Sequence, residues 1–243
     1  MRNLKTLVFT ATFNEVDNIE SLLGDINLYL PDSNILIIDD SSPDGTGLLL
    51  DRLSKSNSHI HVIHRPFKMG LGSAHLGAMK FAIENDYDYL ITMDADYSHH
   101  PKYLPEFINT IQDKDFVIGS RYISGGKCEY GFARTLISRI ANGLTRWLLK
   151  VKTYENTTSY RCFSINLLKK MRLTSLRSNG YSFFIESIYE VHKHTNKIEE
   201  FPIHFEDRMH GKSKISKREI LTASLVLFKL FIQKGLPFST HKK

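Results

Sequence analysis

The chain has 243 residues, of which 42% are apolar and 24% charged, with a formal net charge of +6. It fits one large domain, or a domain with an elaborated tail, and is long enough to bury a real core. Arg2 and Lys5 are not followed by an apolar block long enough for a signal peptide. Cys128 and Cys162 lack metal-ligand spacing, so we expect free thiols in a reducing compartment.

The positive charge is concentrated in the last part of the sequence. Residues 207–243 contain nine Lys or Arg and two acidic residues, a balance of +7, which leaves residues 1–206 near −1 (6 − 7). This basic segment lacks the interleaved aromatic residues that support nucleic-acid binding. An anionic lipid surface is the better expected partner.

The first half of the chain alternates apolar runs with helical periodicity. Runs typical of buried strands occupy residues 7–11, 35–38, 59–63, 90–93 and 116–119. Apolar residues at helical spacing fill the intervals, over residues 19–30, 46–53, 74–83 and 104–111. Strands separated by helices of this length imply right-handed βαβ crossovers, so we predict an α/β fold with a mainly parallel sheet covered on both faces.

Acidic and amide side chains follow three of these strands. They are Asn14 with Glu15, Asp39 with Asp40, and Asp94 with Asp96. Parallel strands end at one edge of a sheet, where ligands bind, and carboxylates at i and i+2 share a face. This edge suits a nucleobase or ribose and a hard divalent cation. The alternative is that these acids only cap the helices that follow.

The second half supplies basic residues and a separate apolar helix. Residues 133–148 have helical spacing and include Arg134 and Arg139, and residues 180–186 open another amphipathic helix. Residues 197–205 are predicted to form an edge strand, because Pro202 cannot donate to a ladder. Residues 220–232 are too few to span a bilayer, which takes about 20 apolar residues. This helix is expected either to lie along a membrane surface or to pack against the domain.

Several segments in order resemble inverting glycosyltransferases of family 2 with the GT-A fold, most closely the dolichol-phosphate mannosyltransferase branch. The resemblance runs from about residue 7 to residue 214. The matching segments are Ala11–Glu15, Asp39–Thr46, the loop with Arg65, Lys68, Gly70 and Gly72, Met93–Pro101, Gly119–Tyr122, and Asp207–Lys214. It implies a GT-A catalytic domain over residues 1–215, followed by an amphipathic basic helix and tail over residues 216–243.

The resemblance also implies roles for particular residues. The nucleotide-sugar pocket would be bordered by Ala11, Phe13, Glu15, Asp40, Asp44, Lys68, Gly70 and Asp94. Asp94 and Asp96 would hold Mg²⁺ or Mn²⁺ on the donor diphosphate. Arg121 and Arg134 would bind the acceptor phosphate, and Arg208 with Lys214 would steady the donor diphosphate.

The chemistry agrees with these roles, because an ionised lipid phosphate is already a nucleophile and needs no strong general base. A metal ion and arginines would neutralise the departing diphosphate. We therefore expect transfer of a hexose to a polyprenyl or dolichyl phosphate with inversion at the anomeric carbon. The expected donor is GDP-mannose and the expected sugar is mannose. The expected place is the cytoplasmic face of a membrane, with a membrane-anchoring subunit as a further candidate partner.

Three residues depart from the family pattern. Glu155 replaces Asp, Ser159 replaces Gly and Phe184 replaces Gln. The last two lie in the half of the chain that shapes the sugar and acceptor pocket. Three alternative functions stay open: glucosyl transfer from UDP-glucose to a polyprenyl phosphate, transfer to a saccharide hydroxyl, and a non-catalytic binding module.

Overall fold

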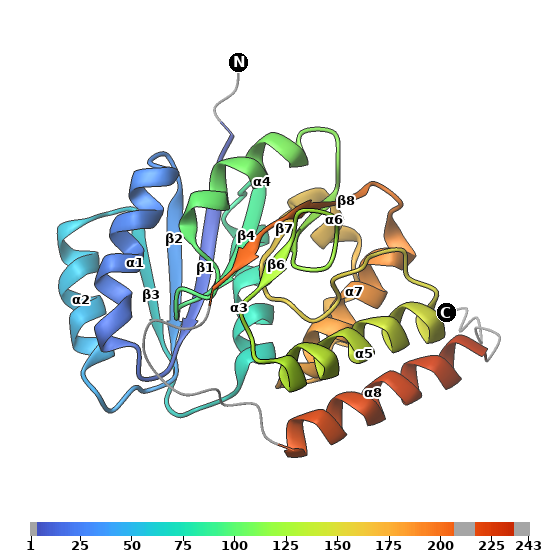
Figure 1. The fold of residues 1–243 in the computed structure, drawn as a ribbon. Helices are drawn as coiled ribbons and strands as arrows, with labels where there is room; N and C mark the ends of the chain where they lie inside the picture. The colour runs from blue at the N-terminus through green and yellow to red at the C-terminus, as the bar shows by residue number, and fades with distance from the viewer. Residues whose placement is uncertain (1–3, 207–216, 236–243) are drawn as a thin grey trace, which may run out of the picture.

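The structure is a computed structural model that describes residues 4–206 and 217–235. Its centre is a seven-stranded sheet of order β3-β2-β1-β4-β7-β5-β8 (Figure 1). The strands are β1 (Thr6–Thr12), β2 (Asn34–Asp39), β3 (Ile60–His64), β4 (Tyr89–Asp94), β5 (Phe116–Ser120), β7 (Arg161–Ser164) and β8 (Ile198–Pro202). Of these, β7 alone runs antiparallel, between β4 and β5. The predicted α/β fold with a mainly parallel sheet is confirmed.

Helices cover both faces of the sheet. They are α1 (Val16–Tyr29), α2 (Thr46–Ser56), α3 (Leu71–Glu84), α4 (Leu104–Ile111), α5 (Phe132–Leu149), α6 (Ile165–Lys170), α7 (Ser182–His194) and α8 (Lys217–Gly235), with short 3-10 turns at Pro101–Tyr103 and Leu173–Ser175.

Strand residues alternate between two apolar cores, as the two-residue period of a strand requires. Val8 and Ile37 pack with α1, α2 and α4, whereas Phe9 and Leu36 pack with α3, α6 and α7. Each of these fully buried side chains contributes roughly 1.5–3 kcal/mol of transfer free energy. The two cores together fix which way the strand ends, and therefore the acidic residues, point.

The segment predicted as one edge strand over residues 197–205 is divided. Strand β8 pairs with β5 at the edge of the sheet, while β9 (His204–Phe205) pairs with β6 (Lys127–Cys128) in a separate ribbon. The division falls at Ile203, whose N–H donates to Ser120 and whose carbonyl accepts from Lys127. Cys128 and Cys162 are free thiols, as expected.

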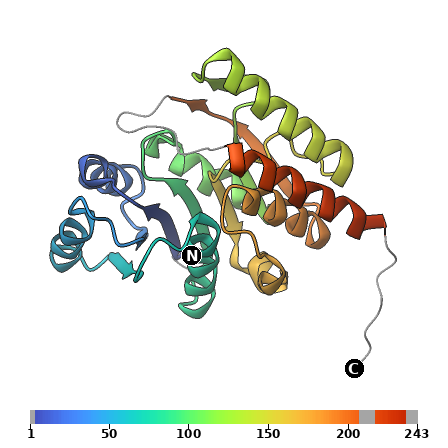
Figure 2. The same cartoon turned by 90° about the horizontal axis from the view of Figure 1, so that it is seen from below.

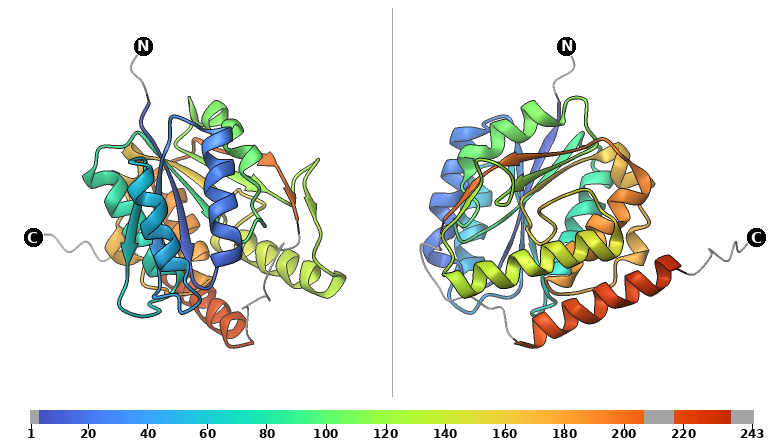
Figure 3. Two further views of the ribbon diagram at one scale, coloured as in Figure 1. Left: turned by 90° about the vertical axis from the view of Figure 1, so that its left-hand side faces the viewer. Right: turned by 45° about the vertical axis from the view of Figure 1, so that its right-hand side comes forward.

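The helix expected near residues 220–232 is α8, and it packs on α5 and α7. Figures 1, 2 and 3 show α8 next to α5. Leu227 is buried against Leu149 and Ile185, and the Lys234 ammonium donates to the Leu149 carbonyl at 2.7 Å. Among the described residues, none of the helices is long and apolar enough to cross a membrane.

Candidate active site

The carboxyl ends of β1, β2 and β4 meet at one edge of the sheet. In the strand register Thr12 lies opposite Asp39, and Ala11 lies opposite both Ile38 and Asp94. The three acidic strand ends predicted from the sequence are therefore neighbours in the structure. Ala11 and Asp94, which the resemblance places in the nucleotide-sugar pocket, belong to directly paired strands.

Two carboxylates at this edge, Asp39 and Asp44, form hydrogen bonds with nearby residues. Asp39 accepts from the Thr12 hydroxyl at 2.9 Å and from the Ser42 hydroxyl at 2.5 Å. Asp44 accepts from the backbone N–H of Val16 and from Thr46. Burial works to raise the pKa of Asp44, but these hydrogen bonds outweigh it and the pKa is lowered. The Asp44 side chain thereby satisfies the first N–H groups of α1 and α2.

The loop before α3 closes over the end of β2. Arg65 forms an ion pair with the buried Asp40, and its guanidinium also donates to the Gly70 carbonyl at 3.1 Å. The Lys68 ammonium lies 4.0 Å from the centre of the Phe13 ring. The structure therefore brings Phe13, Asp40, Lys68 and Gly70 together as the resemblance implied.

Two glycines allow the loop before α3 to contact the segment before α7 closely. Gly70 has φ +94°, and a Cβ there would lie 2.6 Å from the Asn179 carbonyl oxygen. A Cβ on Gly72 would collide with the Ser178 carbonyl oxygen. The segment before α7 consequently packs directly on the start of α3.

Asp94 and Asp96 follow β4 in different environments. The Asp94 side chain is 30% exposed, whereas Asp96 is 5% exposed and accepts from the Ser98 N–H at 3.1 Å. Asp96 does not cap the next helix, because the 3-10 turn at Pro101 is capped by His100. Tyr97 follows Asp96 directly, has φ +62°, and its hydroxyl donates to the Asp25 carboxylate on α1.

These two carboxylates have the chemistry of a partial magnesium or manganese site. Within the described ranges no group of three or more His, Cys, Asp or Glu side chains gathers in a metal-binding arrangement. Mg²⁺ is commonly held by one or two carboxylates with substrate phosphates and water. Hard carboxylate oxygens at a nucleotide edge therefore fit such a cation when a diphosphate supplies the remaining ligands.

A pocket of about 490 Å³ extends from Asp94 to the helices α5, α7 and α8. Its polar lining residues include His99, Arg121, Arg134 and Ser159 together with Asp94. Apolar side chains line it as well, among them Ala133, Ile137, Leu144, Phe184, Ile185 and Leu227. The pocket therefore offers cationic groups for an anionic head group and apolar surface for a hydrocarbon chain.

The two arginines of this pocket differ in their partners. Arg121 donates from Nε and Nη2 to Glu155 at 2.7 and 2.9 Å, and both side chains are almost wholly buried. Burial opposes ionisation of both groups, but their attraction raises the pKa of Arg121 and lowers that of Glu155. Arg134 stacks 3.7 Å from the centre of the Tyr130 ring, and its buried Nη2 has no hydrogen-bond partner in the described part of the chain.

The remaining sequence-predicted residues are placed as follows. Glu15 accepts from the Asn18 amide at 2.9 Å at the start of α1, on the same edge of the sheet. Arg208 and Lys214 lie outside the described residues. The expected acceptor arginines, Arg121 and Arg134, do line one pocket with Asp94.

Sequence reasoning missed the side chains that hold this region in place. The buried His99 ring accepts from the Asp94 N–H at 3.1 Å, and Arg161 donates to the carbonyls of Asn156 and Phe184. Burial lowers the pKa of Arg161 to about 9. The only signal for Arg161 was an arginine at the start of a short strand, and its contact with a residue 23 positions away cannot be deduced from that.

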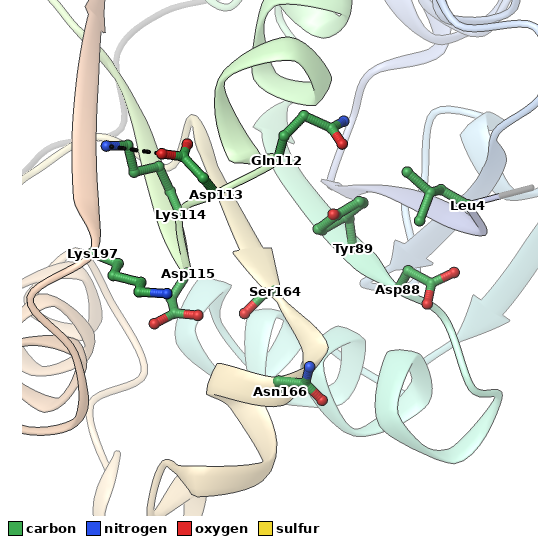
Figure 4. A pocket seen from close by; sticks show the side chains of 10 residues that line it. All are labelled: Leu4, Asp88, Tyr89, Gln112, Asp113, Lys114, Asp115, Ser164, Asn166 and Lys197. Carbon is green, nitrogen blue, oxygen red and sulfur yellow. Dashed lines mark ion pairs between the residues drawn. The ribbon is translucent and has the colours of Figure 1, made fainter. Parts of the chain in front are cut away.

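A second, smaller pocket of about 230 Å³ lies at the opposite edge of the sheet (Figure 4). Asp88, Asp113, Lys114 and Lys197 line it, and Lys114 pairs with Asp113. None of the sequence-predicted site residues lines this pocket. The candidate active site is therefore the pocket beside Asp94.

The fold and the acidic strand ends define a class of proteins, the GT-A glycosyltransferases. The chain belongs to the family described as Glycosyl transferase family 2, which it matches over residues 7–192.

Two curated relatives cover most of the chain. The chain is 34% identical over 214 residues to the undecaprenyl-phosphate mannosyltransferase of Micrococcus luteus, with 88% of each chain covered. It is 36% identical over 222 residues to the polyprenol monophosphomannose synthase of Mycolicibacterium smegmatis, covering 90% of this chain and 84% of the relative.

Solved structures share the fold at lower identity. Glucosyl-3-phosphoglycerate synthase from Mycobacterium tuberculosis, in complex with Mn²⁺, UDP and glucosyl-3-phosphoglycerate, superposes with a TM-score of 0.68 at 17% identity, covering 98% of this chain and 82% of that one. TarS 1-349 from S. aureus with UDP-GlcNAc gives a TM-score of 0.62 at 13% identity, covering 93% and 66%.

Proposed function

We propose that the protein transfers mannose from GDP-mannose to a polyprenyl phosphate with inversion at the anomeric carbon. One observation carries the proposal: the pocket beside Asp94 is lined by Arg121 and Arg134 together with apolar side chains of α5, α7 and α8. A phosphate with a hydrocarbon chain matches this combination. The names of the two curated relatives support the same acceptor class and the same sugar.

In the proposed reaction an oxygen of the acceptor phosphate bonds to the anomeric carbon. The bond from that carbon to the donor diphosphate breaks, and the nucleoside diphosphate leaves with the electron pair. Arg134, with Arg121 behind it, would hold the acceptor phosphate for in-line attack. Because the nucleophile is already ionised, the site needs no carboxylate base.

Asp94 and Asp96 would hold Mg²⁺ or Mn²⁺ against the donor diphosphate. When bound, such an ion neutralises charge on the leaving group. A neighbour of the same fold binds Mn²⁺ together with UDP, which supports this assignment. Arg208 and Lys214 are proposed to add positive charge at the diphosphate. The nucleotide pocket would be bordered by Ala11, Phe13, Glu15, Asp40, Asp44, Lys68 and Gly70.

We also propose that the enzyme attaches peripherally to the cytoplasmic face of a membrane. The neighbouring helices α5 and α8 expose an apolar face made of Phe132, Leu136, Ile140, Leu144 and Trp147 on α5 and Leu221, Leu225, Phe228 and Ile232 on α8. Exposed apolar patches of this kind mark protein or membrane contacts. The +7 balance of residues 207–243 suits anionic head groups, and a membrane-anchoring subunit would have to contact the same region.

The function is tested with radiolabelled GDP-mannose, a short polyprenyl phosphate and Mg²⁺ or Mn²⁺. We expect lipid-extractable mannose with the anomeric configuration opposite to that of the donor. Asp96→Asn should abolish transfer, whereas the matched variant Asp113→Asn, in the pocket of Figure 4, should retain it. Absence of a lipid product with any donor would contradict the proposal.

The alternative reactions are separate arms of the same assay. UDP-glucose as donor tests for a polyprenyl-phosphate glucosyltransferase. Transfer to a saccharide hydroxyl would need a carboxylate base. Glu155 is unsuited to that task, because its pKa is held low in a buried pair with Arg121.

A further inference from the structure

Ser159 lies beside the pair of acidic residues at the end of β4. Its side chain is buried, with 2% of the residue exposed, and its hydroxyl donates to Asp94 Oδ1 at 2.6 Å. A short O–H···O⁻ bond of this length is of the stronger, charge-assisted kind. Nothing in the acidic motif itself predicts this partner, which is 65 positions away in the sequence.

The direction of this hydrogen bond follows from the neighbouring groups. The other acceptor near the Ser159 hydroxyl is His99 Nδ1, at 3.4 Å. That nitrogen already accepts from the Asp94 N–H at 3.1 Å, because a backbone N–H can only donate. The serine proton is therefore directed to the Asp94 carboxylate, which is the shorter contact.

The backbone of Ser159 is held as firmly as its side chain. The Thr92 hydroxyl on β4 donates to the Ser159 carbonyl, and β7, which begins two residues later, pairs with β4 at Thr92 and Arg161. The strand that presents Asp94 thus also fixes the serine that orients it. Such a rigid arrangement sets the direction of a carboxylate before any ligand arrives.

We infer that Ser159 is a positioning residue that orients Asp94 for a divalent cation and so strengthens binding of the cation with a nucleoside diphosphate. This inference rests on the proposed role of Asp94 as a cation ligand. Groups that hydrogen-bond to a metal ligand typically change metal affinity by about 10- to 100-fold when removed. The glycine of the pattern that the sequence resembles has no hydroxyl for this task.

The test is a titration of the full-length protein with Mn²⁺ in the presence of GDP, followed by electron paramagnetic resonance, for wild type, Ser159→Ala and Ser159→Thr. We expect Ser159→Ala to bind Mn²⁺ about 10- to 100-fold more weakly. Ser159→Thr, which keeps the hydroxyl, should recover most of the affinity. In the transfer assay, Ser159→Ala should raise the Mn²⁺ concentration needed for half-maximal rate while leaving the rate at saturating Mn²⁺ nearly unchanged.

Ser164→Ala is the matched control for a merely structural effect. Ser164 is the last residue of β7, the strand that follows Ser159, but its hydroxyl caps α6 by accepting from the Leu167 N–H at 3.2 Å. This variant should lower the melting temperature and leave Mn²⁺ affinity unchanged. Equal Mn²⁺ affinity in wild type and Ser159→Ala, or equal weakening by Ser164→Ala, would overturn the inference.

Failure of the proposed function gives a different result. A wild-type protein that binds Mn²⁺ with GDP but transfers no mannose to a polyprenyl phosphate contradicts the function and leaves the role of Ser159 intact. A wild-type protein that binds no Mn²⁺ with GDP overturns the inference about Ser159.

Discussion

Replacing Glu155 by Gln should strongly destabilise the protein, because it leaves the Arg121 guanidinium buried without its counter-charge. The exposed fractions of the two side chains are 6% for Arg121 and 0% for Glu155, and two hydrogen bonds join them. Removing one partner of a buried ion pair typically costs about 3–5 kcal/mol. For a chain of this length that lowers the melting temperature by about 6–20 °C.

A double-mutant cycle measured by urea unfolding at pH 7 tests this reasoning. We expect Arg121→Met with Glu155→Leu to be much less destabilised than the two single changes added together, with a coupling free energy of about 2–3 kcal/mol. The exposed pair Arg52 and Glu20, separated by 3.8 Å, is the control and should couple by about 0.5 kcal/mol or less. Equal coupling in the two cycles would refute the reasoning.

The same pair predicts how stability changes with acid. The pKa of Glu155 in the folded protein is lowered from its ordinary value of 4.5. Its contribution is therefore complete above about pH 4.5 and is lost as the pH falls through the lowered pKa. The difference in free energy of unfolding between wild type and Glu155→Gln should shrink over that acidic range. It should stay constant between about pH 6 and about pH 8.

Two further outcomes are expected from the pocket and from the exposed apolar face. Arg134→Gln should raise the KM for polyprenyl phosphate by about 10-fold or more, because it removes a charged donor to the phosphate, and should change the KM for GDP-mannose little. Arg139→Gln on the same helix is the control. Equal effects of the two variants would contradict the role of Arg134. Trp147→Glu or Phe228→Glu should each weaken flotation with anionic liposomes by about 10-fold, whereas Leu48→Glu on α2, equally exposed but far from α5 and α8, should not. Binding to the liposomes should also weaken with added salt. Undiminished flotation of both variants would exclude the apolar face as the membrane contact.

The sheet and the position of the acidic edge could be predicted because they depend on local sequence. Apolar runs such as residues 35–38 define strands by themselves, and the parallel arrangement then places Asp39 and Asp94 at one edge. The antiparallel β7 could not be predicted, because four residues of a strand carry little pattern. Its position between β4 and β5 depends on pairing with residues 43 (Ile118 with Arg161) to 75 (Tyr89 with Ser164) positions away.

The partners of the site residues were equally inaccessible from the sequence. The hydrogen bonds of Glu155 with Arg121 and of Ser159 with Asp94 join residues 34 and 65 positions apart. A motif lists residue types along the chain and carries no information about which side chain neutralises another. The motif therefore predicted that Arg121 binds the acceptor phosphate, but gave no sign of its buried partner Glu155. In the part of the chain that the structure describes, Arg134 Nη2 has no hydrogen-bond partner.

The three departures from the family pattern have unequal consequences once their contacts are known. Glu155 completes a buried ion pair with Arg121, and Phe184 packs in the core, edge-on to the His75 ring, with its carbonyl accepting from Arg161. Glu155 supports the pocket from behind Arg121, whereas Phe184 lines the pocket itself. Ser159 alone donates to a carboxylate proposed to bind the cation, so it is the departure able to change donor binding directly. A serine in place of glycine therefore bears on the strength of cation binding more than on the choice of sugar.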